Sequence, residues 1–286
     1  MAGLGTRLYP ISVVLPKGLM PFVLPDGSLT TGLQLITQAL LDAGIERIGV
    51  VVSPENRSVY EAFLAGGCER YAKARAARPN LQQVYESLQR LRKRIEWFEQ
   101  SEPWGLGHAV WCVREFAASE AVLVMLGDHI PIPLNPSTAI TQVLALYAQH
   151  QAPVYGVYRV PLSKVSLYGI LQGAPTETQG VYRLLRLREK PSLDEARQSL
   201  HTEGLGADEF FAHSGVYAFP PALWEVLAQI EAEYTPEHGE WTLTYAQQRL
   251  LERMPAWLVE IPPTLDFGNP HEYRRTFGYF AGYSDV

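Results

Sequence analysis

Short, continuous apolar runs alternate with segments of helical spacing in the first half of this chain, and this alternation restricts its fold most. Ile48 to Val52 and Ala121 to Leu126 are uninterrupted apolar runs of strand length, typical of strands buried on both faces. Leu33 to Ala43 has apolar residues at helical spacing and is followed by Gly44, a common residue after the last helical turn. The order predicts an α/β fold, with a mostly parallel sheet covered by helices on both faces.

The second half of the chain has a more antiparallel character. Tyr168 to Gln172 and Tyr182 to Glu189 have the pattern of a hairpin around a loop that contains Gly, Pro and Thr. Residues 70–94 are rich in Ala, Arg, Gln, Leu and Lys and predict a charged helical excursion. Because no low-complexity linker interrupts the chain, we expect a single domain over residues 1–286 rather than an independent second domain.

Composition and charge exclude several classes of function. The chain has 286 residues, of which 47% are hydrophobic and 19% charged, with a net charge of −6, so nucleic-acid binding through a basic surface is not expected. No apolar run approaches the roughly 20 residues that span a bilayer, and the first residues lack a signal-peptide pattern. Cys68 and Cys112 have neither zinc spacing nor a disulfide framework. We therefore expect a cytoplasmic protein that binds small molecules and no membrane.

A glycine-containing loop at the start of the chain suits a polyphosphate. Residues 2–8 read Ala-Gly-Leu-Gly-Thr-Arg-Leu. Gly3 and Gly5 allow the backbone to approach a ligand without a Cβ, and N–H groups in such a turn can bind an anion. Arg7 and the later Lys17 supply positive charge for phosphate oxygens. The loop matches neither the P-loop nor the dinucleotide-binding pattern, and its glycines alone fit a tight strand-to-helix connection equally well.

Two carboxylates follow predicted strands. Asp128 comes shortly after the run that ends at Leu126, and Asp266 follows the expected strand Trp257 to Ile261. Ligands of open parallel sheets bind at the carboxyl ends of the strands, and Mg²⁺ prefers one or two carboxylates together with phosphate oxygens. Because prolines follow Asp128 where a capped helix would begin, we expect it to bind a divalent cation. For Asp266, the Gly and Asn that follow favour an Asx turn on spacing alone.

Three further positions are candidates for nucleotide or phosphate binding. Gln100 carries a donor and an acceptor on one amide, which can pair with the edge of a base. Gly105 opens a second glycine turn before an expected helix. Lys190 follows Glu189 at the abrupt end of an expected strand and could hold a phosphate. Taken alone, Lys190 is more often an ordinary surface lysine.

The order of these motifs resembles the sugar-1-phosphate nucleotidyltransferases, most closely the bacterial UTP–glucose-1-phosphate uridylyltransferases. Besides Gln100, the matching stretches follow the family's order over nearly the whole chain: AGLGTRL at 2–8, LPKGLMP at 15–21, GLGHAV at 105–110, LGD at 126–128, VSLYG at 165–169, EKP at 189–191, GEWTLT at 239–244 and LDFGN at 265–269. The resemblance implies a Rossmann-like, three-layer α/β/α fold with a mostly parallel mixed sheet. Met1 stands where the family's first strand should end, so that strand is expected to be missing here.

The resemblance also implies a reaction and roles for the matching residues. A nucleoside triphosphate, UTP by the closest likeness, and a sugar 1-phosphate such as glucose 1-phosphate would give a nucleotide sugar and pyrophosphate. Residues 1–160 would form the nucleotide-binding half and residues 161–286 the sugar-phosphate-binding half. The implied residues are Gly3, Leu4, Gly5, Gln100 and Gly105 for the nucleotide; Arg7 and Lys17 for the phosphates of the triphosphate; Asp128 and Asp266 for Mg²⁺; and Gly169, Glu189, Lys190 and Glu240 for the sugar phosphate.

Alternatives within and outside this chemistry stay open at the level of sequence. A thymidylyl-, cytidylyl- or guanylyltransferase would share the fold, as would a nucleotide-sugar-binding homologue without turnover. The joint presence of the cations and both carboxylates favours an enzyme, whereas the incomplete amino terminus favours the binding homologue. Because the family forms dimers and tetramers, a homo-oligomer is a further expectation.

Three positions depart from the family's usual pattern. Gly18 stands where the uridylyltransferases usually carry Glu, and Tyr245 replaces the usual Asp after Leu-Thr. His129 stands where a second Asp is common. These residues can tune the choice of substrate or mark a loss of selection on it.

Overall fold

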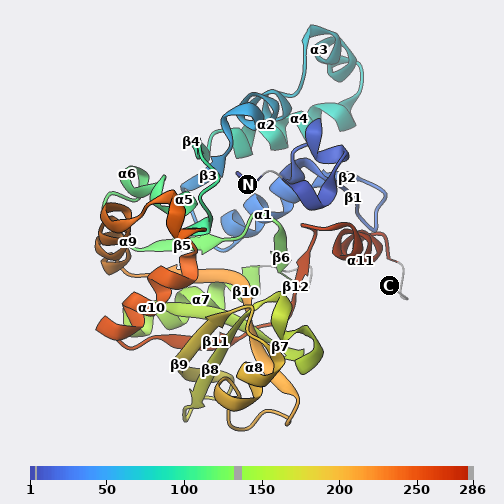
Figure 1. The fold of residues 1–286 in the computed structure, drawn as a ribbon. Coiled ribbons are helices and arrows are strands. Elements are labelled where there is room, and N and C mark those ends of the chain that lie inside the picture. Colours follow the sequence, from blue (N-terminus) through green and yellow to red (C-terminus); the bar gives the residue numbers. More distant parts are fainter. Residues whose placement is uncertain (4, 132–136, 283–286) are drawn as a thin grey trace. The chain divides into compact units, whose positions relative to one another are not determined.

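The computed structural model describes residues 1–3, 5–131 and 137–282, and the chain divides into two units (Figure 1). The first unit contains Met1–Pro103 and Asp266–Val286, and the second contains Trp104–Leu265. The predicted halves, 1–160 and 161–286, are defined by the substrate that each is expected to bind, whereas the two units are defined by contacts within the fold. The predicted halves therefore stay a prediction.

The first unit contains a parallel strand pair and an antiparallel hairpin. The parallel pair is β3 (Ile48–Val52) with β4 (Ile95–Glu99), and the hairpin is β1 (Pro21–Val23) with β2 (Leu29–Thr31). The helices of this unit are α1 (Gly32–Asp42), α2 (Pro54–Ala65), α3 (Glu69–Ala76), α4 (Pro79–Arg92) and α11 (Pro270–Phe280). Helices α3 and α4 account for the predicted helical excursion.

Phe22 on β1 is the centre of an aromatic cluster in the first unit. Its fully buried ring lies 5.4 Å from the ring centroids of both Phe267 and Phe280. Gly32 at the start of α1 makes room for this cluster, because a Cβ there would lie 2.4 Å from the Phe267 ring. The Tyr273 hydroxyl donates to the Pro21 carbonyl at 2.6 Å. Helix α11, from the far end of the sequence, is therefore packed and hydrogen-bonded onto the β1 strand.

The second unit is built on a six-stranded sheet in the order β5-β10-β7-β11-β9-β8. Its strands are β5 (Val122–Met125), β7 (Val154–Pro161), β8 (Gly169–Pro175), β9 (Val181–Glu189), β10 (Glu209–Phe219) and β11 (Trp257–Glu260). Strand β8 also pairs with β10, so the sheet curls back on itself. Two short strands, β6 (His129–Pro131) and β12 (Thr264–Asp266), form a separate ribbon.

The helices of the second unit pack in two places. Helix α7 (Ser137–His150) lies against β7, β10 and β11. Helices α5 (Leu106–Trp111), α9 (Ala222–Glu233) and α10 (Leu243–Arg253) pack on one another, and α10 also contacts β9. The remaining helices of this unit are the short α6 (Arg114–Ala117) and α8 (Leu193–Ser199).

The mixed α/β class predicted from the sequence is confirmed, but the expectation of a mostly parallel sheet is not met in the described residues. The pairs β3/β4 and β7/β11 are parallel. Strand β10 is antiparallel to β5, β7 and β8, and β9 is antiparallel to β8 and β11. Continuous apolar runs indicate burial on both faces and carry no information on direction, so the long, buried β10 could not be oriented from its sequence.

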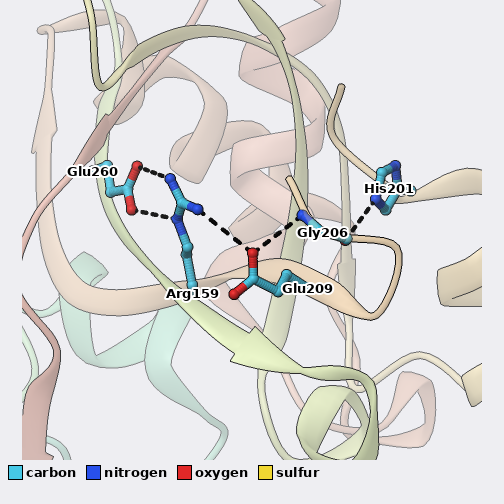
Figure 2. Close-up of polar contacts among 5 residues, drawn as sticks. All are labelled: Arg159, His201, Gly206, Glu209 and Glu260. Carbon is cyan, nitrogen blue, oxygen red and sulfur yellow. Dashed lines mark hydrogen bonds and ion pairs between the residues drawn. The ribbon is translucent and has the colours of Figure 1, made fainter. Parts of the chain in front are cut away.

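A charged cluster joins three neighbouring strands of the second unit (Figure 2). Arg159 on β7 donates to both carboxylate oxygens of Glu260 on β11, at 2.6 and 3.1 Å, and lies 3.5 Å from Glu209 on β10. Both carboxylates raise the pKa of Arg159 above its ordinary value, and the hydrogen bonds with Glu260 contribute most. Because the Arg159 side chain is 43% exposed, the cluster is worth about 1 kcal/mol or less. It adds a side-chain link between strands that are already paired through their backbones.

The cysteines and the helices bear on the compartment and on membrane binding. Cys68 and Cys112 are free thiols, the first exposed and the second partly buried. Among the described residues, every helix is too short or too polar to cross a lipid bilayer.

Replacing Phe22 with Ala should lower the free energy of unfolding by about 3–5 kcal/mol, because a fully buried ring leaves a cavity among its aromatic neighbours. Leu29→Ala on the paired strand β2 is the matched control, since Leu29 is 72% exposed. Denaturant titration followed by tryptophan fluorescence measures both variants. Equal effects of the two substitutions would contradict the central place of Phe22 in this core.

Candidate functional site

The glycine loop of the first unit turns sharply at Gly5. This residue has a φ of +65°, and its carbonyl accepts the N–H of Leu8 at 2.8 Å. Gly3 and Arg7 are exposed, so the loop presents a bare backbone and a cation to solvent. Leu4, predicted to contact the nucleotide, lies outside the described residues.

Lys17 begins a short 3-10 turn, and the residue beside it explains one departure from the family. Gly18 is buried and donates its N–H to the Tyr60 hydroxyl at 3.2 Å. A Cβ on Gly18 would lie 2.8 Å from that hydroxyl and 2.5 Å from the Met1 sulfur. The space for a glutamate at this position is therefore filled by Tyr60, whose pKa burial raises above its ordinary value.

Gln100 and Gly105, the two residues expected near the base, belong to different units. Gln100 follows β4, is only 6% exposed, and donates its backbone N–H to the Val52 carbonyl at 2.9 Å. Gly105 precedes α5 with a φ of +118°. A Cβ on Gly105 would lie 2.5 Å from the Trp241 carbonyl oxygen and 2.6 Å from Glu240 Cγ. A glycine is therefore required at this position, and it lies directly against Glu240, a predicted sugar-phosphate residue.

Asp128 lies in the turn between β5 and β6, beside His129. Its Oδ1 is 3.0 Å from His129 Nδ1, and the two side chains are 15% and 13% exposed. Gly215 on β10 makes room for this turn: it has a φ of +85°, and a Cβ there would lie 3.2 Å from His129 Cβ. The Leu126 N–H donates to the Gly215 carbonyl at 2.9 Å. A bulge in β10 thus fixes the turn that carries Asp128.

Asp266 is the last residue of β12. This strand pairs with β6, which begins at His129. One ligand atom from each of Asp128, His129 and Asp266 lies within 4.8 Å of the others. Asp266 Oδ1 also accepts the N–H of Gly268 at 2.6 Å, which is the Asx turn that the spacing favoured. The two arrangements are compatible, because a carboxylate has about four acceptor positions. Carboxylates and imidazoles are side-chain types that bind divalent cations.

The predicted sugar-phosphate residues Gly169 and Glu189 face each other at one end of the β8/β9 hairpin. The Thr244 hydroxyl on α10 donates to Glu189 Oε2 at 3.1 Å and orients that carboxylate. A Cβ on Gly169 would lie 2.6 Å from His213 Cδ2 and 2.9 Å from Glu189 Oε2. The absence of a side chain at Gly169 therefore keeps Glu189 and His213 close together.

Lys190 has an unusual backbone for a lysine. Its φ is +44°, in the left-handed region that favours glycine. Its N–H donates to the Tyr168 carbonyl at 3.0 Å, and its 63% exposed side chain places Nζ 3.9 Å from Glu189 Oε1. Strain of this kind concentrates at functional positions. The structure thus brings Gly169, Glu189 and Lys190 together, as the EKP motif and the preceding strand predicted.

Two buried groups beside these residues were not predicted from the sequence. Tyr217 on β10 is buried, and its pKa is raised by that burial and, to a smaller extent, by the carboxylates of Glu189 and Asp128. Both carboxylates are therefore near this one phenol. Burial lowers the pKa of His213 to about 3, against a hydrogen bond with Gln247 that favours the charged ring. His213 is therefore neutral, and its Nδ1 has no hydrogen-bond partner among the described residues.

Nothing in the sequence marks Tyr217 or His213 as members of a site. Tyr217 and His213 stand in an apolar strand whose pattern indicates only burial. Thr244 is the last residue of the matching stretch GEWTLT, so the motif places it near the site without giving its partner.

Comparison with known proteins agrees with this arrangement of motifs. A family model described as nucleotidyl transferase matches residues 1–275. The UTP–glucose-1-phosphate uridylyltransferase of Bacillus subtilis (strain 168) is 31% identical over 252 residues, which cover 88% of this chain and 78% of that protein. UTP–glucose-1-phosphate uridylyltransferase 2 of Streptococcus pyogenes serotype M1 is 29% identical over 232 residues, covering 80% and 72%.

Solved structures with similar folds belong to the same group of proteins. A UDP-glucose pyrophosphorylase complexed with UDP-glucose has a TM-score of 0.78 and 22% identity, covering 98% of this chain and 96% of its own. A putative glucose-1-phosphate thymidylyltransferase from Bacillus anthracis has a TM-score of 0.69 and 17% identity, covering 100% and 93%. At these identities the likeness shows the fold. Since the family model spans residues 1–275 and a relative is 31% identical over 88% of the chain, this chain belongs to the nucleotidyl transferase family.

Proposed function

We propose that this protein transfers a uridylyl group from UTP to glucose 1-phosphate, giving UDP-glucose and pyrophosphate. The named relatives and the fold support this assignment. The observation that carries it is the bulged segment of β10, against which the residues expected at the metal and those expected at the sugar both pack. A Cβ on Gly169, which faces Glu189, would lie 2.6 Å from His213 of this segment, and a Cβ on Gly215 of this segment would lie 3.2 Å from His129, the neighbour of Asp128.

The reaction joins two anions, so its barrier comes from charge repulsion and misorientation. A phosphate oxygen of glucose 1-phosphate attacks the α-phosphorus of UTP, and pyrophosphate leaves. The attacking oxygen is already ionised at neutral pH, so no general base is required. Arg7 and Lys17 are assigned to the triphosphate and the leaving pyrophosphate, and Lys190 to the sugar phosphate.

The carboxylates of Asp128 and Asp266 are suited to Mg²⁺, which prefers oxygen ligands and takes one or two carboxylates beside phosphate oxygens. The bound ion would supply charge that offsets the repulsion between the two substrates. His129, with Nδ1 3.0 Å from Asp128 Oδ1, restricts the orientation of that carboxylate. Gly3, Leu4 and Gly5 would line the nucleotide, Gln100 and Gly105 its base, and Gly169, Glu189 and Glu240 the sugar.

A cytoplasmic location and a homo-oligomeric state belong to the same proposal. Two free thiols are compatible with a reducing compartment. The oligomeric state rests on analogy with the family.

A pyrophosphate-release panel of four nucleoside triphosphates against several sugar 1-phosphates tests the proposed reaction. We expect the highest kcat/KM with UTP and glucose 1-phosphate. Higher kcat/KM with dTTP, CTP or GTP would assign the protein to another branch of the family. Ligand binding without pyrophosphate release from any pair would identify a binding homologue instead.

Asp128→Asn should lower kcat by a factor on the order of 10³, because the amide removes the charge that holds the cation. Binding of Mn²⁺, followed by electron paramagnetic resonance, should weaken in parallel. Asp194→Asn on α8 is the control, since Asp194 is an exposed carboxylate of the same unit. Normal turnover of the Asp128 variant in Mg²⁺ would contradict the metal assignment.

Lys190→Ala should raise the KM for glucose 1-phosphate on the order of 10-fold, because one charge-assisted contact to the phosphate is lost. The KM for UTP should change much less. Lys73→Ala on α3, which removes an exposed lysine that pairs with Glu69, is the control. An equal rise in both KM values would place Lys190 elsewhere in the reaction.

A further inference from the structure

Two segments of the second unit are joined by backbone hydrogen bonds: residues 104–107, which enter α5, and residues 239–242, which precede α10. The Trp241 N–H donates to the Trp104 carbonyl at 2.6 Å, and the Gly107 N–H donates to the Trp241 carbonyl at 2.9 Å. Trp241 therefore bonds through both of its backbone polar groups to the facing segment. The first segment contains Gly105 and the second contains Glu240.

The two segments are also in steric contact, without space for side chains on the facing glycines. A Cβ on Gly105 would lie 2.6 Å from Glu240 Cγ, and a Cβ on Gly107 would lie 2.4 Å from Trp241 Cδ1. A side chain on either glycine would collide with the facing segment, so the two segments can lie this close only because both residues are glycines. The close contact and the two backbone hydrogen bonds hold the segments against each other.

Four aromatic rings, from Trp104, His108, Tyr234 and Trp241, surround this joint and form what we term the aromatic clasp. Neighbouring ring centroids lie 4.8 to 5.7 Å apart, which is the range of favourable aromatic contact. Trp241 is only 2% exposed. The Tyr234 hydroxyl also donates to the Gly239 carbonyl at 2.9 Å, so the segment that carries Glu240 is held on both sides.

The indole N–H of Trp241 makes no hydrogen bond within the part of the chain that the structure describes, so the ring is held at this joint by packing and not by a polar contact. Nε1 is buried and has no hydrogen-bond partner among the described residues, although a buried indole N–H usually has one. A Cβ on Gly107 would lie 2.5 Å from Nε1, so the ring edge faces the glycine backbone instead of an acceptor. The Trp241 ring therefore packs directly on the backbone of the facing segment.

We propose that Trp241 is a positioning residue that couples the base subsite at Gly105 to the sugar subsite at Glu240. This inference rests on the proposed function, which assigns Gly105 to the base and Glu240 to the sugar. Because Trp241 is hydrogen-bonded to Trp104 and Gly107 on either side of Gly105 and directly follows Glu240, its substitution should disturb both subsites. Trp241 thus differs from Lys190, which acts on the sugar phosphate alone.

Trp241→Ala should weaken the binding of both UMP and glucose 1-phosphate, measured separately by isothermal titration calorimetry. It should also lower kcat/KM for both substrates by a factor on the order of 10 to 100, as expected when reacting groups are misplaced by about 1 Å. Trp241→Phe, which keeps an aromatic ring in the clasp, should restore most of the loss. All titrations are made well below the Tm of each variant, so lost stability does not imitate lost affinity.

Trp257→Ala is the matched control, because Trp257 is a tryptophan of the same unit that stacks on His150 at 3.8 Å, outside the clasp. It should lower the Tm and leave both affinities unchanged. Tyr234→Phe is a second variant in case Trp241→Ala does not fold. It removes only the hydroxyl that holds Gly239, and should weaken the binding of both UMP and glucose 1-phosphate several-fold.

The outcomes separate this inference from the function on which it rests. If the wild-type protein binds both ligands, and Trp241→Ala or Tyr234→Phe leaves the affinities unchanged, the inference is overturned and the function stands. Loss of only one affinity in Trp241→Ala also overturns the coupling. A wild-type protein that binds neither UMP nor glucose 1-phosphate would overturn the proposed function and the inference together.

Discussion

The bulge in strand β10 is the constraint on which the candidate site depends. Between His213 and Tyr217 the pairing with β7 loses its register, and Gly215 takes a φ of +85°. A Cβ at Gly215 would contact His129, so only a glycine lets the turn that carries Asp128 lie against the strand. One irregularity thus brings His213 beside Gly169 and Tyr217 near two carboxylates.

The electrostatics of the second unit depend on the same strand. Burial raises the pKa of Tyr217, and the negative charge of Glu189 and Asp128 adds to this effect. The phenol therefore stays neutral and adds no charge of its own to this part of the unit. His213, kept neutral by burial, likewise adds no cation that would compete for Glu189. The cationic side chain closest to Glu189 in the sequence, Lys190, is left exposed, where a phosphate can reach it.

The sequence alone predicted the parts of this arrangement that depend on local pattern. The apolar runs located β3 and β5, and the charged excursion located α3 and α4. The hairpin expected from Tyr168 to Gln172 and Tyr182 to Glu189 corresponds to β8 and β9, and the family resemblance grouped Gly169, Glu189 and Lys190 at the sugar phosphate. The motifs also placed Asp128 in a turn that directly follows a strand. Each of these predictions uses only residues that are neighbours in the sequence or that belong to one hairpin.

Features that depend on contacts between distant segments could not be predicted in this way. The direction of β10 depends on strands that are remote in the sequence, and a buried apolar run is compatible with either direction. Thr244 reaches Glu189 across 55 residues. Tyr60 and Met1 fill the space that a glutamate at position 18 would need. The sequence around Gly18 does not reveal these two neighbours. The partner of a residue is a property of the fold, whereas its chemical type is a property of the sequence.

The backbone of Lys190 shows how the two kinds of information combine. The sequence places a lysine before a proline, and proline restricts the backbone of the residue that precedes it. The structure places that lysine at a φ of +44°, which costs on the order of 1–3 kcal/mol for a residue with a side chain. A glycine would relieve this strain but would remove the ammonium group. The hydrogen bond from the Lys190 N–H to Tyr168 and the pairing of Glu189 with Gly169 hold the strained backbone, so the hairpin fixes the point from which the lysine side chain extends.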